Sequence, residues 1–316
     1  MKYKIKLLFC MILMSGLITT NNTTCQWLDK LFNSPKLSPK ISRYEKINNR
    51  LFIGSNVLVR LICLSRTLTT HKYLKNNKYF IDAPYKTVKQ VRDIANKFNI
   101  KNAKTIQVKN PNSFISYISQ SLACAYGRTV VINRDKLDNL SREMGLSFQE
   151  KRQLERFILG HELTHIKNKD YYLGHLLHII SPLIAHFGLK GLNTGLSKIA
   201  NYWFQNNPAI SSTLKMWKKI SNFFMIKNLI AMSFENFIMR QQEYRADRGS
   251  AEGLGIEATR SGIRSFTFLD KKINKNIPSK ILQRFIDPEH PSFRNRVKQL
   301  RKIEKKQLST TGNGNE

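Results

Sequence analysis

The sequence predicts an α+β fold that is mostly helical, with a small β-sheet. Two patterns support this prediction. Apolar residues recur at three- and four-residue steps over long stretches, as in amphipathic helices. Two short runs, at 105–108 and 129–133, are rich in β-branched residues, which favour strands. The helices therefore outnumber the strands.

The first predicted element of the folded domain is a helix from Thr87 to Phe98. Its apolar residues share one face, namely Val88, Val91, Ile94, Ala95 and Phe98. A strand is expected around Thr105 to Val108, and a second strand from Thr129 to Asn133. An exposed edge at the second strand would pair with an extended peptide by strand addition.

A long helix is predicted to begin at a capping box formed by Ser147 and Glu150. From this start, four residues recur at three- and four-residue steps and define one buried stripe: Leu154, Ile158, His161 and His165. The two histidines therefore face inward, where a metal ion is shielded from solvent.

Residues 161–165 read His-Glu-Leu-Thr-His. Two histidines four residues apart on a helix point the same way, so both imidazoles can hold one zinc ion. Glu162 lies between them and can act as general base on a zinc-bound water. This pattern indicates a zinc hydrolase, although a surface helix that carries the same residues by chance is the alternative.

A third zinc ligand is expected from a later helix, because catalytic zinc sites usually have three protein ligands. Glu243 and Asp247 lie one turn apart and share a face. Glu243 is the candidate ligand, and Asp247 would accept a hydrogen bond from the free ring nitrogen of a zinc histidine. The alternative is a solvated face, because Arg245 and Arg248 alternate with the two acids.

Three motifs in this order resemble the zinc endopeptidases of the HtpX, CAAX prenyl protease and Oma type, family forty-eight of the metallopeptidases. They are His161 to His165, Glu243 to Asp247, and Asp287-Pro288-Glu289-His290-Pro291. The resemblance covers about residues 85 to 305 and implies a zincin-like catalytic domain of the gluzincin type. It implies one Zn²⁺ per chain, held by His161, His165 and Glu243, with Glu162 as base.

The third motif also implies a role for His290, as an oxyanion stabiliser or an occlusive fourth ligand. A turn residue is the alternative. The sequence departs from the family at Leu122 to Gly127, where relatives carry an Asn-Ala-Phe-Ala-like segment before the strand that lines the cleft. This departure concerns substrate binding rather than the metal chemistry.

The predicted organisation has four parts. Residues 1–20 form a signal peptide or N-terminal membrane anchor, because a charge-free apolar run from Leu7 to Ile18 follows a basic start. Residues 21–84 form a linker and a basic N-terminal region. Residues 85–307 form the peptidase domain, with a helical insertion at about 171–239, and residues 308–316 form a disordered tail.

The insertion contains two apolar segments, Tyr171 to Leu189 and Asn222 to Met239. Lys227 and Glu235 interrupt the second one. A helical hairpin packed over the catalytic core is favoured, because a central charge costs about 3 kcal/mol on membrane-insertion scales. The alternative is a pair of membrane spans. The basic N-terminal flank predicts an exported domain in the cell envelope, with an integral membrane protein as the alternative.

The formal net charge of +32 suits apposition to anionic lipid, although a bias towards AT-rich codons would also produce it. Nucleic acid is not an expected partner, because no binding motif is present and the basic residues are spread along the chain. Protein or peptide substrates are expected instead. The resulting hypothesis is a zinc-dependent endopeptidase for quality control or processing of membrane or envelope proteins. The alternative is a non-catalytic, chaperone-like or adaptor protein, against which the presence of Glu162 argues.

Overall fold

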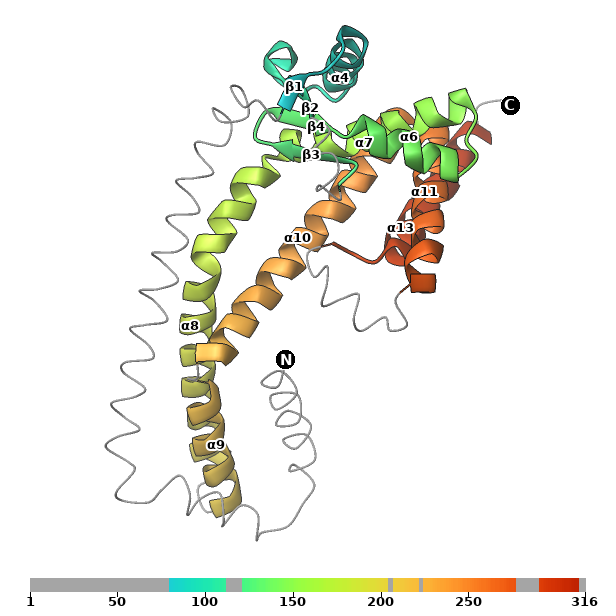
Figure 1. The fold of residues 1–316 in the computed structure, drawn as a ribbon. Helices are drawn as coiled ribbons and strands as arrows, with labels where there is room; N and C mark the ends of the chain where they lie inside the picture. The colour runs from blue at the N-terminus through green and yellow to red at the C-terminus, as the bar shows by residue number, and fades with distance from the viewer. Residues whose placement is uncertain (1–79, 112–120, 204–206, 222–223, 277–289, 313–316) are drawn as a thin grey trace. The chain divides into compact units, whose positions relative to one another are not determined.

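The larger structural unit contains a mixed four-stranded sheet with the order β1-β2-β4-β3 (Figure 1). The strands are β1 (Phe80–Asp82), β2 (Gln107–Pro111), β3 (Ala123–Tyr126) and β4 (Thr129–Ile132). β2 and β4 are parallel, and the two outer pairs are antiparallel. The computed structural model describes residues 80–111, 121–203, 207–221, 224–276 and 290–312.

The described residues divide into two compact units. The larger unit comprises residues 80–178 and the described residues from 233 to 312, and the smaller comprises the described residues from 179 to 232. The mostly helical α+β class predicted from the sequence is confirmed. The predictions for residues 1–79 fall outside the described residues, including the signal peptide or anchor and the linker.

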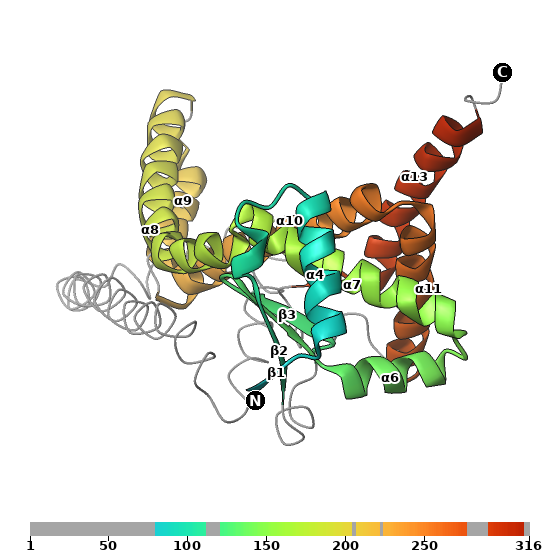
Figure 2. The same cartoon turned by 90° about the horizontal axis from the view of Figure 1, so that it is seen from above.

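Two helices of the larger unit pack on the sheet, and the others pack on these helices or on one another. They are α4 (Tyr85–Lys97), α6 (Arg134–Glu143), α7 (Phe148–Asn168), α11 (Ile256–Asn276), α13 (Phe293–Gly312), and the parts of α8 (Asp170–Trp203) and α10 (Phe224–Leu254) that belong to it. α4 packs on β2 and on α7, and α7 also packs on β3 and α11 (Figure 2). The main hydrophobic cluster has Val91, Val130, Phe157 and Leu163 among its most buried members, and a second cluster packs α6 against α7.

The structure confirms the predicted first helix and the predicted start of the long helix. α4 buries Val91, Ile94 and Ala95, and Val88 packs against the same core. At the start of α7, the Ser147 amide donates to Glu150 Oε2 over 2.8 Å, and the Glu150 amide donates to Ser147 Oγ over 3.3 Å. The prediction of a single buried stripe on this helix underestimated its burial, because β3, α4 and α11 contact α7 and bury it on several sides.

The predicted domain start at residue 85 lies just after β1, which pairs with β2 and so belongs to the sheet. Two local predictions differ from the structure. The strand expected from Thr105 begins at Gln107, since residues 103–105 form a short 3₁₀ helix. The tail is helical as far as Gly312, and the Ser309 and Thr310 hydroxyls donate to the Lys306 carbonyl one turn earlier.

The predicted substrate-binding edge at Thr129 to Asn133 was also misplaced. β4 pairs with β2 on one side and with β3 on the other, so both of its backbone edges are occupied. All four residues of β4 are buried. Within the described sheet, the strand that contacts α7 and has one unpaired edge is β3.

The smaller unit is helical in its described residues. It contains the later part of α8, all of α9 (Pro208–Ser221) and the first part of α10. Polar side chains meet inside it: Asn193 Nδ2 donates to Ser221 Oγ over 2.8 Å, and Lys227 Nζ donates to His186 Nδ1 over 3.3 Å. These contacts tie α8 to the helices that follow it.

Within the larger unit, α10 approaches α7 closely at Gly249. A Cβ atom added there would lie 2.6 Å from Thr164 Oγ1 and 2.7 Å from Thr164 Cγ2. Thr164 is buried and β-branched, and its hydroxyl donates to the Gly160 carbonyl over 2.8 Å, so it has little freedom to move. A residue with no side chain therefore permits this helix contact.

We predict that Gly249→Ala lowers the free energy of unfolding by about 1 to 3 kcal/mol, because it overpacks the contact between α10 and α7. Denaturation of the purified protein measures this effect. Gly191→Ala is the control, since a Cβ there meets no atom within 4 Å, and alanine favours the helix by up to about 1 kcal/mol. Equal stability of the two variants would contradict the prediction.

Candidate metal centre

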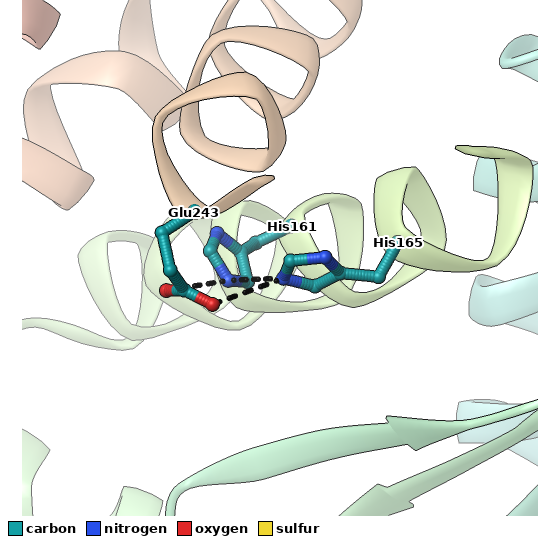
Figure 3. Close-up of side chains that lie close together, drawn as sticks. All are labelled: His161, His165 and Glu243. Carbon is teal, nitrogen blue, oxygen red and sulfur yellow. Dashed lines mark hydrogen bonds and ion pairs between the residues drawn. The ribbon is translucent and has the colours of Figure 1, made fainter. Parts of the chain in front are cut away.

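His161, His165 and Glu243 come together although α10 begins more than fifty residues after α7 ends (Figure 3). Their ligand atoms all lie within 4.8 Å of one another. The two Nε2 atoms are 3.1 Å apart, and Glu243 carboxylate oxygens lie 3.5 Å from His161 Nε2 and 3.3 Å from His165 Nε2. The corners of a tetrahedral zinc site with bonds of about 2.0 to 2.1 Å are about 3.3 to 3.4 Å apart. The three donors therefore fit three corners of such a site.

Each histidine ring is oriented by a carboxylate at its Nδ1 atom, on the side of the ring away from Nε2. His161 Nδ1 lies 2.9 Å from Asp247 Oδ1, and His165 Nδ1 lies 2.9 Å from Asp170 Oδ2. A proton on each Nδ1 donates to its carboxylate, which leaves each Nε2 with a lone pair directed towards Glu243. Both rings are thus held in the tautomer that binds a metal.

Asp247 lies where the sequence predicted it, on the face of α10 that Glu243 also occupies. Asp170 was not predicted at the site. Lys169 has φ 57°, so the chain turns in a left-handed conformation after α7, and Asp170 begins α8 directly behind His165. Arg245 donates to the same carboxylate. The turn itself carries no sequence signature strong enough to reveal this contact.

Arg296 is the second residue that sequence reasoning missed. Its guanidinium donates to both oxygens of Asp247, over 2.6 and 2.7 Å, and lies 3.4 Å from Glu243 Oε2. Its cationic carbon also lies 4.1 Å from the centre of the Phe266 ring. Arg296 is buried, unlike the neighbouring basic residues of α13, and only the tertiary packing distinguishes it from them.

The charges of the centre leave room for a divalent cation. Four acids converge here, namely Glu162, Glu243, Asp170 and Asp247, and two arginines, Arg245 and Arg296, pair with them. With neutral histidines, two negative charges remain. Burial opposes ionisation of Asp247, but the adjacent Arg296 guanidinium and the His161 ring hold its pKa below the usual value. A Zn²⁺ ion therefore fits both the spacing and the charge of the site.

Glu162 is 7 % exposed and lines the same cleft as the three donors. Burial raises the pKa of its carboxyl group, while the nearby histidines and Arg296 oppose the rise. His290, predicted at this site, lies with its Nε2 atom 3.8 Å from Glu243 Oε1, and about half of its side chain is exposed. Both residues can therefore reach a molecule bound at the centre.

The cleft has a volume of about 2190 Å³. β3 lines one wall through Ala123, Cys124 and Ala125, in the segment where the sequence departs from the family pattern. Burial, together with the Glu162 charge, raises the pKa of the Cys124 thiol to about 12. Cys124 is therefore a neutral thiol at physiological pH and serves as a small apolar lining residue.

Comparison with known proteins gives this centre a family. The model of peptidase family M48 matches residues 86–304, which is more than half of the chain. The chain belongs to peptidase family M48. Peptidases of the M48 family depend on a metal ion, in agreement with the three donors found here.

The chain is similar to curated proteins that carry the name Protease HtpX. Those of Actinobacillus pleuropneumoniae serotype 5b (strain L20) and serotype 3 (strain JL03) are each 25% identical over 162 residues. The match covers 50% of this chain and 52% of each relative, so the chain spans about half the length of the curated relatives it matches. No solved structure matched the chain.

We predict that Asp247→Ala and Asp170→Ala each weaken zinc affinity by about ten- to a hundredfold, because each removes the acceptor that orients a histidine. Competition with a metal chelator measures the affinity. Asp138→Ala is the control, since Asp138 pairs only with Lys151 at the surface among the contacts seen, 2.9 Å away. Unchanged affinity in both variants would remove the two carboxylates from the site.

Proposed function

We propose that the protein is a zinc-dependent endopeptidase. The observation that carries this proposal is the arrangement of His161, His165 and Glu243 beside the buried Glu162 in one large cleft. Membership of a peptidase family and the relationship to proteins named Protease HtpX support the same reaction. Zinc binding alone would not require Glu162, which argues against a non-catalytic chaperone-like or adaptor role.

In this proposal, bound Zn²⁺ supplies a Lewis acid that lowers the pKa of water and polarises the scissile carbonyl. Glu162 removes a proton from the attacking water and gives it to the departing amine. His290, within reach of the centre on its exposed side, stabilises the negative charge that develops on the carbonyl oxygen. Asp247, Asp170 and Arg296 hold the ligands in place throughout.

An extended substrate would pair with β3, the strand that lines the cleft and leaves one edge unpaired within the sheet. Its lining residues are small, so a second backbone can come close. Backbone pairing imposes little side-chain preference. The substrate class therefore depends on the remaining walls of the cleft.

We predict that Glu162→Gln retains about one zinc per chain and cleaves casein at least a hundredfold more slowly, since it removes the base and no ligand. His161→Ala and Glu243→Ala lose the zinc, because each removes one of three ligands. Elemental analysis and gel-based digestion measure the two effects. Cleavage by Glu162→Gln at the wild-type rate would refute the proposed mechanism, and a zinc-loaded wild type without proteolytic activity would favour the adaptor alternative.

We further propose that the smaller unit inserts into a membrane. Its surface is inverted relative to a water-soluble protein. Ser181, Asn193, Ser221 and Lys227 are buried. Large apolar residues are exposed instead, including Ile184, Phe187, Leu192, Ile199, Leu229 and Met232. Lipid is the solvent in which this distribution is stable, because exposed apolar groups avoid water and buried polar groups find partners.

The dimensions of α8 support the same proposal. It has 34 residues and an apolar segment long enough to cross a membrane by length and composition. A helix of this size is about 51 Å long, whereas the hydrocarbon core of a bilayer is about 30 Å thick. Lys227, which argued against a span in the sequence, is buried beside His186 and would be shielded from lipid. Membrane insertion therefore replaces the hairpin over the catalytic core as our preferred hypothesis, and membrane or envelope proteins are the proposed substrates.

We predict that the full chain stays in the membrane fraction at 1 M salt and at alkaline pH and is released only by detergent, because apolar contacts with lipid are not screened. Ile184→Asp combined with Phe187→Asp should release a substantial fraction, since each charge costs about 3 kcal/mol in hydrocarbon. Phe148→Asp, at an exposed position in the larger unit, is the control. Release of wild type by salt alone would instead place the protein on the membrane surface.

A further inference from the structure

Exposed basic residues of α13 lie along the cleft that contains the metal centre. Five exposed basic residues of this helix line the cleft, namely Arg294, Lys298, Arg301, Lys302 and Lys305. We call them the α13 basic row. The one acid of α13, Glu304, lies outside the cleft lining and binds Arg260 over 3.0 Å. The row is therefore not neutralised by its own helix.

Little negative charge faces this row from the other walls. α6 contributes another cation, Lys136, to the cleft lining. Away from the metal centre, the acids among the described lining residues are Asp270 and Glu143. Glu143 is occupied by Lys272, at 2.6 Å. The described walls on this side of the cleft thus leave a positive excess, and cleft walls of one sign concentrate the field on a bound molecule.

The row and the metal centre line the same cleft, which also includes His161 and Glu162. Arg296, which touches Asp247 and Glu243, points to the other side of α13, because residues two apart on a helix lie about 200° apart. From Arg294 to Lys305 the row extends along α13 for about 16 Å, at 1.5 Å per residue. About five residues of extended peptide cover the same length, at roughly 3.3 Å per residue. A substrate that extends from the metal centre along this cleft would therefore place about five of its residues beside the row.

We infer that the α13 basic row selects substrates that carry an acidic segment of about five residues next to the cleavage site. This inference rests on the proposed function and adds the substrate class. Charge complementarity identifies the partner as carboxylate-rich peptide. The row lines the cleft of a proposed peptidase, where the expected ligand is a peptide, so an acidic peptide is the anion that we propose. Anionic lipid headgroups and nucleic acid share the charge and become outcomes of the test.

The test uses quenched fluorescent peptides that share one scissile segment, taken from a casein site cleaved by the wild type. One peptide carries five glutamates beside that segment and the other carries five glutamines, with separate pairs for the two sides of the bond. For one of the two sides, the wild-type kcat/KM at low salt should favour the glutamate peptide at least about fivefold, and 0.5 M salt should reduce the preference.

A quadruple variant probes the row directly, with Lys298, Arg301, Lys302 and Lys305 all changed to Gln. Its ratio of glutamate to glutamine kcat/KM should fall to about one, with normal zinc content as the check on folding. The matched control changes four exposed lysines outside the cleft lining to Gln, namely Lys86, Lys89, Lys97 and Lys101. It removes the same total charge and should keep the wild-type ratio.

Binding provides a readout that does not require proteolysis. Fluorescence anisotropy with Glu162→Gln should show tighter binding of the glutamate peptide, and adding the four cleft changes should abolish the difference. A wild-type ratio near one, or equal loss in the control variant, would overturn the inference and leave the proposed function intact. If the ratio is unchanged while the cleft variant no longer binds phosphatidylglycerol vesicles or duplex DNA, the row serves that anion and the inference fails. Absence of cleavage by the zinc-loaded wild type refutes the proposed function, and the binding result then decides the inference alone.

Discussion

The buried contact between Arg296 and Asp247 is the interaction on which the rest of the catalytic unit depends. It joins α13 to α10, and Asp247 also contacts His161 on α7. Removing one partner of a buried ion pair costs about 3 to 5 kcal/mol, because the other charge is left without compensation. The same contact that stabilises the packing of three helices therefore fixes the first ligand, and it places Glu243 one turn away at the right distance from both histidines.

The second histidine is held by an independent device. Asp170 contacts His165 and accepts a hydrogen bond from Arg245. The two rings are therefore oriented from two helices, α8 for His165 and α10 for His161. Gly249 lets α10 come close enough to α7 for these contacts to form. A centre built in this way is preorganised, since neither ring has to turn when a metal binds. In our proposals, substrate binding falls to the surrounding walls, with the β3 edge for the backbone and the α13 basic row for acidic side chains.

The two structural units have opposite surfaces. In the larger unit most charged residues are exposed, apart from those at the metal centre and a few others, and the apolar residues form two clusters inside. In the smaller unit large apolar residues lie outside, and the polar groups bind one another inside. These distributions fit two solvents, water for the first and lipid for the second. The inversion could not be read from the sequence, where Lys227 and Glu235 only appeared as charges within an apolar segment.

The sequence alone determined α7 with its capping box and histidine pair, and the shared face of Glu243 and Asp247, because each depends on spacing along one helix. It also determined the family, because three motifs occur in the family's order. It did not determine which partners lie across the fold. Asp170 and Arg296 look like an ordinary helix start and one arginine among many, and burial against distant elements gives them their roles. The edge strand was misassigned for the same reason: β-branched residues predict a strand, but strand order decides which strand has a free edge. Periodicity along one helix or strand can be read from neighbouring residues, whereas contacts between residues of different helices form only when the chain packs.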